Sequence, residues 1–263
     1  MTLVEIEPVG SAAHVTELRL NRPEARNALS IEMCDAITEA LAAIDDGDAR
    51  AVIVTGAGKT FCAGADFSAV SGPGALDFLP AFERMLEAVA RHRLPTIAAI
   101  HGAALGGGLQ LATVCDFRVA TTDATFGIPS SRLGIVINFE NVRRLVHLIG
   151  VPTAKEVLLT ARTYRGPHAE RAGLVTQLVE AGDAGPPAQV ARGAAVELAR
   201  GIAQLAPLAV QGAKRSIQAV VDHMSAEPDD DVRALVAQAY SSRDLQEGLA
   251  AMAGKRDPDF EGT

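Results

Sequence analysis

Tryptophan is absent from this chain of 263 residues, and aromatic residues make up only 4% of it. Ala, Val, Leu and Ile supply the apolar bulk instead, which favours close packing of helices against a sheet. No apolar run approaches the ~20 residues that cross a bilayer, so no transmembrane helix and no membrane partner are expected. The formal net charge of -8 leaves no basic excess, which argues against a nucleic-acid partner.

Cysteine is scarce, and its three residues are scattered at positions 34, 62 and 115. An odd, dispersed set of thiols is typical of a reduced intracellular protein and predicts neither a disulfide framework nor a zinc site. The six histidines do not cluster either, so no metal ion is expected. Residues 1–7 are acidic and lack the basic start of a secretory signal. We therefore expect a cytoplasmic protein.

Hydrophobic periodicity predicts alternating strands and helices up to about residue 180. Ser30 is a plausible N-cap for a helix whose apolar face recurs at every third or fourth residue. The stretch 182–187 (Gly-Asp-Ala-Gly-Pro-Pro) is the clearest break, and residues 188–254 are almost wholly helical in pattern. We expect an α/β core over residues 1–187 and a helical C-terminal extension over 188–263. The strands are predicted at 2–7, 13–20, 51–55, 96–100 and 117–120.

Two short segments combine small residues with a preceding β-branched, strand-like run. They are 61–66 (Phe-Cys-Ala-Gly-Ala-Asp) and 101–108 (His-Gly-Ala-Ala-Leu-Gly-Gly-Gly). Small residues allow a backbone N–H to reach a ligand, and two converging amides can stabilise an oxyanion. Each segment also has a simpler interpretation. The first can be a turn into a helix with Asp66 as N-cap, and the glycines of the second can permit close helix–strand packing.

Residues 56–60 (Gly-Ala-Gly-Lys-Thr) suggest a nucleotide-binding loop at first sight. A P-loop requires Gly-x-x-x-x-Gly-Lys-[Ser/Thr], and Ile53, inside the predicted strand, occupies the place of its first glycine. Gly64 also interrupts the helix that should follow Lys-Thr. We therefore interpret the segment as a turn at a strand end and keep Lys59 only as a candidate cation for a phosphate.

Together the segments 61–66 and 101–108 resemble the signature of the crotonase superfamily, the enoyl-CoA hydratase/isomerase family. Three further segments resemble that family in the same order, at 21–29, 127–134 and 247–260. The resemblance implies a ββα spiral core with a helical C-terminus, assembled as a homotrimer or dimer of trimers. It also implies an acyl-CoA substrate and no separate cofactor, because coenzyme A enters as part of the substrate.

The resemblance assigns the two oxyanion donors to the amides of Ala65 and Gly107, which hold the thioester carbonyl as it becomes an enolate. The positive end of a helix dipole adds to the second donor, because Gly107 stands at a predicted helix start. Glu24 stands where family members usually carry Lys, which removes a cation near the nucleotide end of the ligand. The positions that match CoA-binding residues are Arg26, Ala28, Ala63, Ala65, Asp66, Phe67, Gly107 and Lys255.

The acid–base residues depart from the family's pattern. Hydratases of the family carry glutamates at the positions of Gln110 and Ser130. Hydration needs a base to activate water and an acid to protonate the α-carbon, and neither Gln nor an unassisted Ser exchanges protons near neutral pH. Ordinary hydratase activity is therefore not expected.

Glu140 is the candidate replacement acid–base group, projecting into the acyl pocket. The alternative is that Glu140 is a charged residue in a first helical turn, where the helix dipole favours it. Asn138 lies near the place where dienoyl-CoA isomerases carry an Asp, but an amide cannot shuttle protons. Two hypotheses stay open: an acyl-CoA isomerase or hydratase-like enzyme that works through an enolate, and a non-catalytic acyl-CoA-binding protein of the same fold.

Overall fold

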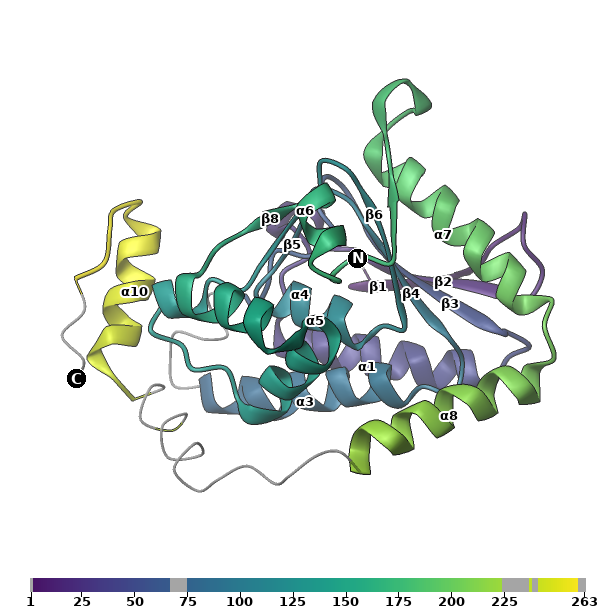
Figure 1. The fold of residues 1–263 in the computed structure, drawn as a ribbon, viewed down its shortest axis with the longest axis horizontal. Helices are drawn as coiled ribbons and strands as arrows, with labels where there is room; N and C mark the ends of the chain where they lie inside the picture. Colours follow the sequence, from purple (N-terminus) through teal and green to yellow (C-terminus); the bar gives the residue numbers. More distant parts are fainter. Residues whose placement is uncertain (1, 67–74, 224–236, 238–240, 260–263) are drawn as a thin grey trace.

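The computed structural model describes residues 2–66, 75–223, 237 and 241–259. Its main sheet has six strands in the order β1-β2-β3-β4-β6-β9 (Figure 1). The first pair is antiparallel and the other pairs are parallel. The strands are β1 (Val4–Pro8), β2 (Val15–Leu20), β3 (Ala51–Gly56), β4 (Thr96–Ile100), β6 (Phe117–Thr121) and β9 (Gln177–Val179).

A smaller sheet joins β5 (Ala103–Leu105), β7 (Thr125–Gly127) and β8 (Tyr164–Arg165). Strands β4 and β5 lead into helix α4 (Gly107–Val114), and β6 and β7 lead into helix α5 (Phe139–Thr160). The chain therefore winds in successive ββα units, as the resemblance implies. Short helical elements lie between the units: η1 (Pro23–Ala25), η2 (Ser130–Arg132), α6 (Gly166–Arg171) and η3 (Gly182–Ala184).

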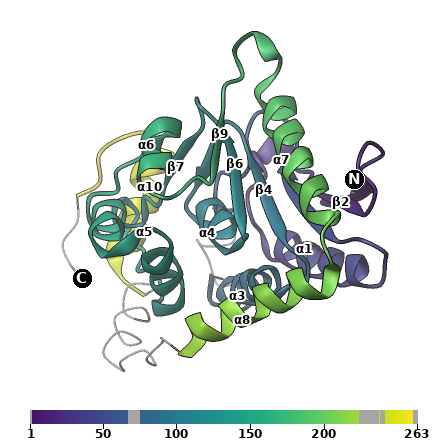
Figure 2. The same ribbon diagram turned by 45° about the vertical axis from the view of Figure 1, so that its right-hand side comes forward.

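Both faces of the main sheet are covered by helices. Successive side chains of a strand point to opposite sides, so each buried strand contributes to two cores. On β3, Val52 and Val54 join the core that contains α1 (Ile31–Asp45) and α3 (Ala75–Arg91). Ala51 and Ile53 join a second core with helix α7 (Pro187–Ala203). Figure 2 shows α7 running along the sheet. The continuous apolar run of β3 thus reflects burial on two sides.

Helix α7 packs on the sheet through a line of alanines spaced four residues apart, at 191, 195, 199 and 203, all of them buried. Small side chains at this spacing allow the helix backbone to approach the strands closely. The break predicted at 187 marks the start of the helical part, but it does not coincide with a break in packing, since α7 is part of the core. Helices α8 (Pro207–His223) and α10 (Arg243–Ala253) complete the described C-terminal part.

The prediction of Ser30 as a helix N-cap is confirmed. The Ser30 hydroxyl accepts a hydrogen bond from the Met33 amide at 3.3 Å and caps α1. His101 is buried, with Nε2 3.1 Å from the Gly58 carbonyl, and burial lowers its pKa. Its role is structural. No described helix is long and apolar enough to cross a membrane, and no group of His, Cys, Asp or Glu among the described residues is placed to hold a metal ion.

The three thiols are buried, and burial raises the pKa of each to about 12. Because the thiolate is the reactive form, we expect Cys34, Cys62 and Cys115 to resist a disulfide reagent at pH 8 in the native protein. All three should react after unfolding in guanidinium. Absorbance of the released thiol measures both states, and fast labelling of any one cysteine in the native protein would contradict the prediction.

Candidate active site

A cavity of about 440 Å³ opens where the segments after β3 and β4 meet helix α3 and the start of α5. Apolar side chains from α3 and from residues 128–137 form much of its wall, and Met252 reaches it from α10. A few polar groups interrupt this apolar lining. Such a combination is typical of a small-molecule site, in which the apolar wall supplies affinity and the polar groups supply orientation.

Ala65 and Gly107 both line this cavity, and their amides are available to a ligand. Leu29 donates to the Gly64 carbonyl at 2.8 Å and accepts from the Asp66 amide at 2.7 Å, so the Ala65 N–H between them is left out of the pairing. Gly107 is the first residue of α4, where an N–H has no partner within the helix. Neither amide donates to another residue in the described part of the chain.

The two amide segments approach each other so closely that position 64 requires glycine. Gly64 has a φ of +113°, and a Cβ there would lie 2.9 Å from the Leu105 carbonyl oxygen. A Cβ on Gly107 would lie 3.4 Å from the Ala65 nitrogen and 3.2 Å from the Phe82 ring. The amides of Ala65 and Gly107 are therefore neighbours at one wall of the cavity, which is the arrangement that an oxyanion hole requires.

Asn27 fixes the loop of residues 21–29 against this wall. It is fully buried, with a φ of +55°, and its Nδ2 donates to the carbonyls of Ala57 at 2.9 Å and Thr60 at 2.8 Å. The Ala63 amide donates to the Arg26 carbonyl at 3.0 Å. The sequence analysis identified Asn27 only as part of the segment 21–29, although Asn is one of the residue types that tolerate a positive φ.

Gln110 and Ser130 line the same cavity as the two amides. Gln110 is 8% exposed, and its Oε1 has no hydrogen-bond partner within the described ranges. Ser130 begins η2, on the segment that follows β7. Gln110 and Ser130 are thus brought together at this cavity, and neither side chain exchanges protons readily near neutral pH.

Comparisons with known proteins identify the family of this chain. The family model for enoyl-CoA hydratase/isomerase matches residues 10–263. The chain belongs to the enoyl-CoA hydratase/isomerase family. The probable enoyl-CoA hydratase echA6 of Mycobacterium tuberculosis (strain CDC 1551 / Oshkosh) is 35% identical over 254 residues, which are 97% of this chain and 98% of that protein. The crotonase resemblance is therefore confirmed.

Solved structures with the same fold cover nearly all of the chain. An enoyl-CoA hydratase/isomerase from Pseudoalteromonas atlantica T6c is 27% identical, with a TM-score of 0.82 over 98% of this chain and 100% of that one. A methylmalonyl-CoA decarboxylase complexed with 2S-carboxypropyl CoA has a TM-score of 0.88 over 100% of this chain and 99% of that one. At 22% identity, this second likeness concerns the fold alone.

Most of the candidate CoA-binding positions from the sequence analysis lie at the cavity. Arg26, Ala28, Ala63 and Asp66 line it together with the two amides. The Asp66 carboxylate forms an ion pair with Arg22, which gives that side chain a structural partner. Lys255 is exposed in the turn after α10 and does not line the cavity, and Phe67 lies outside the described residues.

Residues 56–60 form the turn at a strand end that the sequence predicts. Gly58 has a φ of +78°, and Lys59 is exposed rather than enclosed by a helix start. Glu24 is exposed as well, in η1 beside Arg26. The turn and η1 are in contact, since a Cβ on Gly58 would lie 2.8 Å from Pro23.

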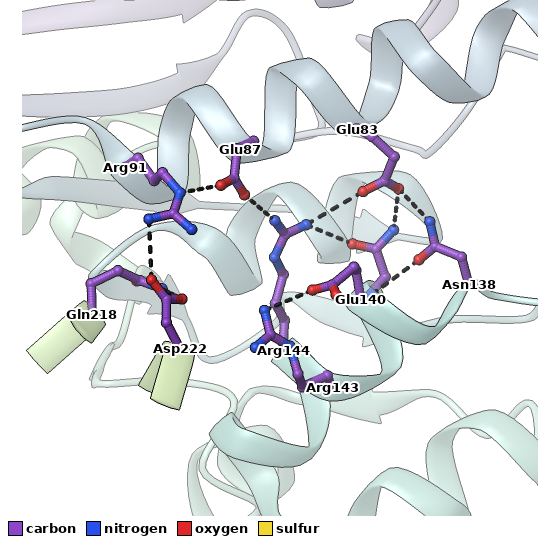
Figure 3. Close-up of polar contacts among 10 residues, drawn as sticks. Glu83, Glu87, Arg91, Asn138, Glu140, Arg143, Arg144, Gln218 and Asp222 are labelled. Atoms are coloured by element: carbon purple, nitrogen blue, oxygen red, sulfur yellow. Dashed lines mark hydrogen bonds and ion pairs between the residues drawn. The ribbon is translucent and has the colours of Figure 1, made fainter. Parts of the chain in front are cut away.

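The position of Glu140 favours the second of its two interpretations, a charged residue in a first helical turn, over a group that projects into an acyl pocket. Glu140 does not line the cavity but lies in an adjacent groove between α3 and α5, where its Oε2 is 2.7 Å from an Arg143 nitrogen (Figure 3). The physical reason is helix geometry: Asn138 caps α5, and the side chains three residues apart at 138 and 141 face the cavity while Glu140 faces away. Glu140 fits the alternative role of a charge in a first helical turn.

Glu83 is the site residue that the sequence analysis missed. It comes from α3 and lines the cavity, and its Oε1 accepts hydrogen bonds from Asn138 Nδ2 at 2.8 Å and Asn141 Nδ2 at 2.6 Å. Asp66 and Glu83 are the carboxylates at this cavity within the described part of the chain, and Asp66 is already held by Arg22. Glu83 is therefore the carboxylate at this cavity without an ion pair as close as that of Asp66, and it is the candidate acidic group of the site.

Proposed function

We propose that the chain acts on an acyl-CoA thioester and stabilises an enolate derived from it. The observation that carries this proposal is the pair of neighbouring amides of Ala65 and Gly107, both without a protein partner among the described residues and both at the cavity wall. A thioester oxygen bound there accepts two hydrogen bonds, which strengthen as it gains negative charge. One such donor is worth about 10²–10³ in rate.

The rest of the cavity supports binding of an acyl-CoA. Phe78, Leu79 and Phe82 from α3 offer an apolar wall for an acyl group. Arg26 lies at the cavity on a loop that is fixed by Asn27, and its guanidinium forms no ion pair with the described residues. An exposed cation of this kind suits the phosphates of coenzyme A.

Proton transfer within the acyl group fits the site better than hydration. Gln110 and Ser130 offer no carboxylate to activate water and protonate the α-carbon as a pair. A double-bond shift needs only one group that removes a proton from one carbon and returns it to another. The same two residues also favour a second candidate, an acyl-CoA-binding protein without catalysis, because oxyanion amides hold a ground-state thioester as well.

A homotrimer or dimer of trimers stays part of the proposal. Helix α8 carries apolar side chains that the single chain leaves exposed, namely Leu208 at 85%, Ile217 at 66% and Val220 at 59%. Contact with a second copy of the chain is one way to bury such side chains.

The binding part of the proposal is tested by calorimetry with acetyl-CoA and longer acyl-CoA thioesters. We expect saturable binding that weakens with added salt, because the phosphates meet exposed cations. Arg26→Ala should lower the affinity and reduce the salt dependence, whereas Arg165→Ala, an exposed arginine away from the cavity, should change neither. Absence of binding at millimolar ligand would contradict both candidate functions.

A further inference from the structure

We propose that Glu83 is the group that moves the substrate's proton at this site, and that Asn138 and Asn141 position it. The inference rests on the proposed enolate chemistry and identifies its acid–base residue. Glu83 shares the cavity with both oxyanion amides. Its neighbour in α3, Phe82, has its ring 3.2 Å from where a Cβ on Gly107 would lie, so this turn of α3 sits against the oxyanion wall.

The two asparagines are oriented as donors by their other partners. Asn138 Oδ1 accepts from the Asn141 amide at 3.0 Å, so its Nδ2 is turned toward Glu83. Asn141 Oδ1 accepts from Arg144 Nη1 at 3.0 Å, so its Nδ2 is turned the same way. Two amide donors that are directed at one oxygen bind and orient a carboxylate, since a carboxylate oxygen accepts more than one hydrogen bond.

The second oxygen of Glu83 is held less tightly. Oε2 lies 3.5 Å from Arg144 Nη1, and Arg144 makes a shorter contact of 2.6 Å through Nη2 with Glu87 (Figure 3). Glu87 is in turn paired with Arg91, which also meets Asp222 of α8. The network therefore fixes the side chain through Oε1 and leaves Oε2 able to accept a proton. The side chain of Glu83 is 29% exposed, so solvent can exchange that proton.

The proton-transfer step balances without another reactant. Oε2 takes a proton from the α-carbon of the bound thioester, and the electron pair of that C–H bond becomes the enolate, whose oxygen lies on the Ala65 and Gly107 amides. The carboxylic acid of Glu83 then returns a proton to the same carbon, or to the γ-carbon when a β,γ double bond is present. The first route exchanges hydrogen with solvent, and the second moves the double bond into conjugation.

The test compares Glu83→Gln with Glu140→Gln. Both variants neutralise a glutamate that contacts an arginine of α5, but only Glu83 lines the cavity. Each protein is incubated with 3-butenoyl-CoA in D₂O, and NMR follows deuterium at the α-carbon and formation of crotonyl-CoA. We expect Glu83→Gln to slow both by about 10²-fold or more, and Glu140→Gln to match the native protein. Calorimetry should give all three proteins similar affinities for the ligand.

A third variant separates positioning from folding. Asn138→Ser keeps an oxygen that can cap α5 but removes the amide donor to Glu83. It should lower kcat with little change in KM, and its melting temperature should stay near that of the native protein. A fall in the melting temperature with unchanged kcat would show that Asn138 serves only the helix.

The outcomes distinguish this inference from the proposed function. If the native protein exchanges deuterium and Glu83→Gln exchanges it equally fast, the role of Glu83 is overturned while enolate chemistry stands. If the native protein binds the thioester but exchanges nothing, Glu83 moves no proton and the non-catalytic candidate is favoured. If Glu140→Gln is the slow variant instead, the original hypothesis on Glu140 is restored.

Discussion

Replacing Gly107 with proline should lower the rate of α-proton exchange by about 10²–10³-fold, because proline removes one of the two oxyanion donors. Gly107 is the first residue of α4, a position where a helix tolerates proline because the N–H is not used within the helix. The thioester should still bind, since the cation proposed to meet the coenzyme A phosphates, Arg26, is unchanged, so the loss should fall on kcat more than on KM. Deuterium incorporation from D₂O measures the effect.

Gly107→Ala is the matched control for this variant. It adds the same Cβ, 3.2 Å from the Phe82 ring and 3.4 Å from the Ala65 nitrogen, but it keeps the N–H. The ring must move by a few tenths of an ångström, so a small loss is expected from alanine and a large one from proline. Equal losses from both variants would mean that crowding at Phe82, and not the amide, accounts for the effect.

The parts of the fold that could be predicted from the sequence are those with a local physical signal. The apolar run of β3 is buried on two sides, and such burial produces a continuous run rather than an alternating one. The start of α1 was evident from Ser30, whose hydroxyl caps the helix. The positions of Ala65 and Gly107 followed from small residues after two strands together with the family resemblance.

The rest depends on contacts between distant segments. Glu83 lies beside the apolar face of α3, and a charged residue at such a position is expected to be exposed to solvent. Its partners Asn138 and Asn141 follow 55 and 58 residues later in the sequence. Glu140 is close to these asparagines in sequence but lies in the adjacent groove between α3 and α5. The alanines of α7 predict a helix but not the surface that it covers. None of these contacts between distant segments produces a periodic pattern that could be recognised in a single sequence.

The second large effect is expected from placing carboxylates at positions 110 and 130, where the sequence analysis expects hydratases of the family to carry them. The double variant Gln110→Glu with Ser130→Glu should raise the hydration of crotonyl-CoA by orders of magnitude, since each acid or base supplies roughly 10²–10⁴ in rate. Both positions already line the cavity with the oxyanion amides. Gln110 Oε1 has no hydrogen-bond partner within the described ranges, so replacing Gln110 with Glu breaks no hydrogen bond of this oxygen. Loss of enoyl absorbance measures the reaction.

The single variants are the controls for this prediction, and each should gain much less than the double variant, because the two groups act on one water and one α-carbon as a unit. Native turnover at ordinary hydratase rates would falsify the view that Gln110 and Ser130 disable hydration. A different conclusion would follow from a folded double variant that binds the thioester but hydrates it no faster than the native protein. It would mean that the wall formed by Glu83 and Asn138 holds the acyl group where water cannot attack it, so that the cavity is built for proton transfer within the acyl group.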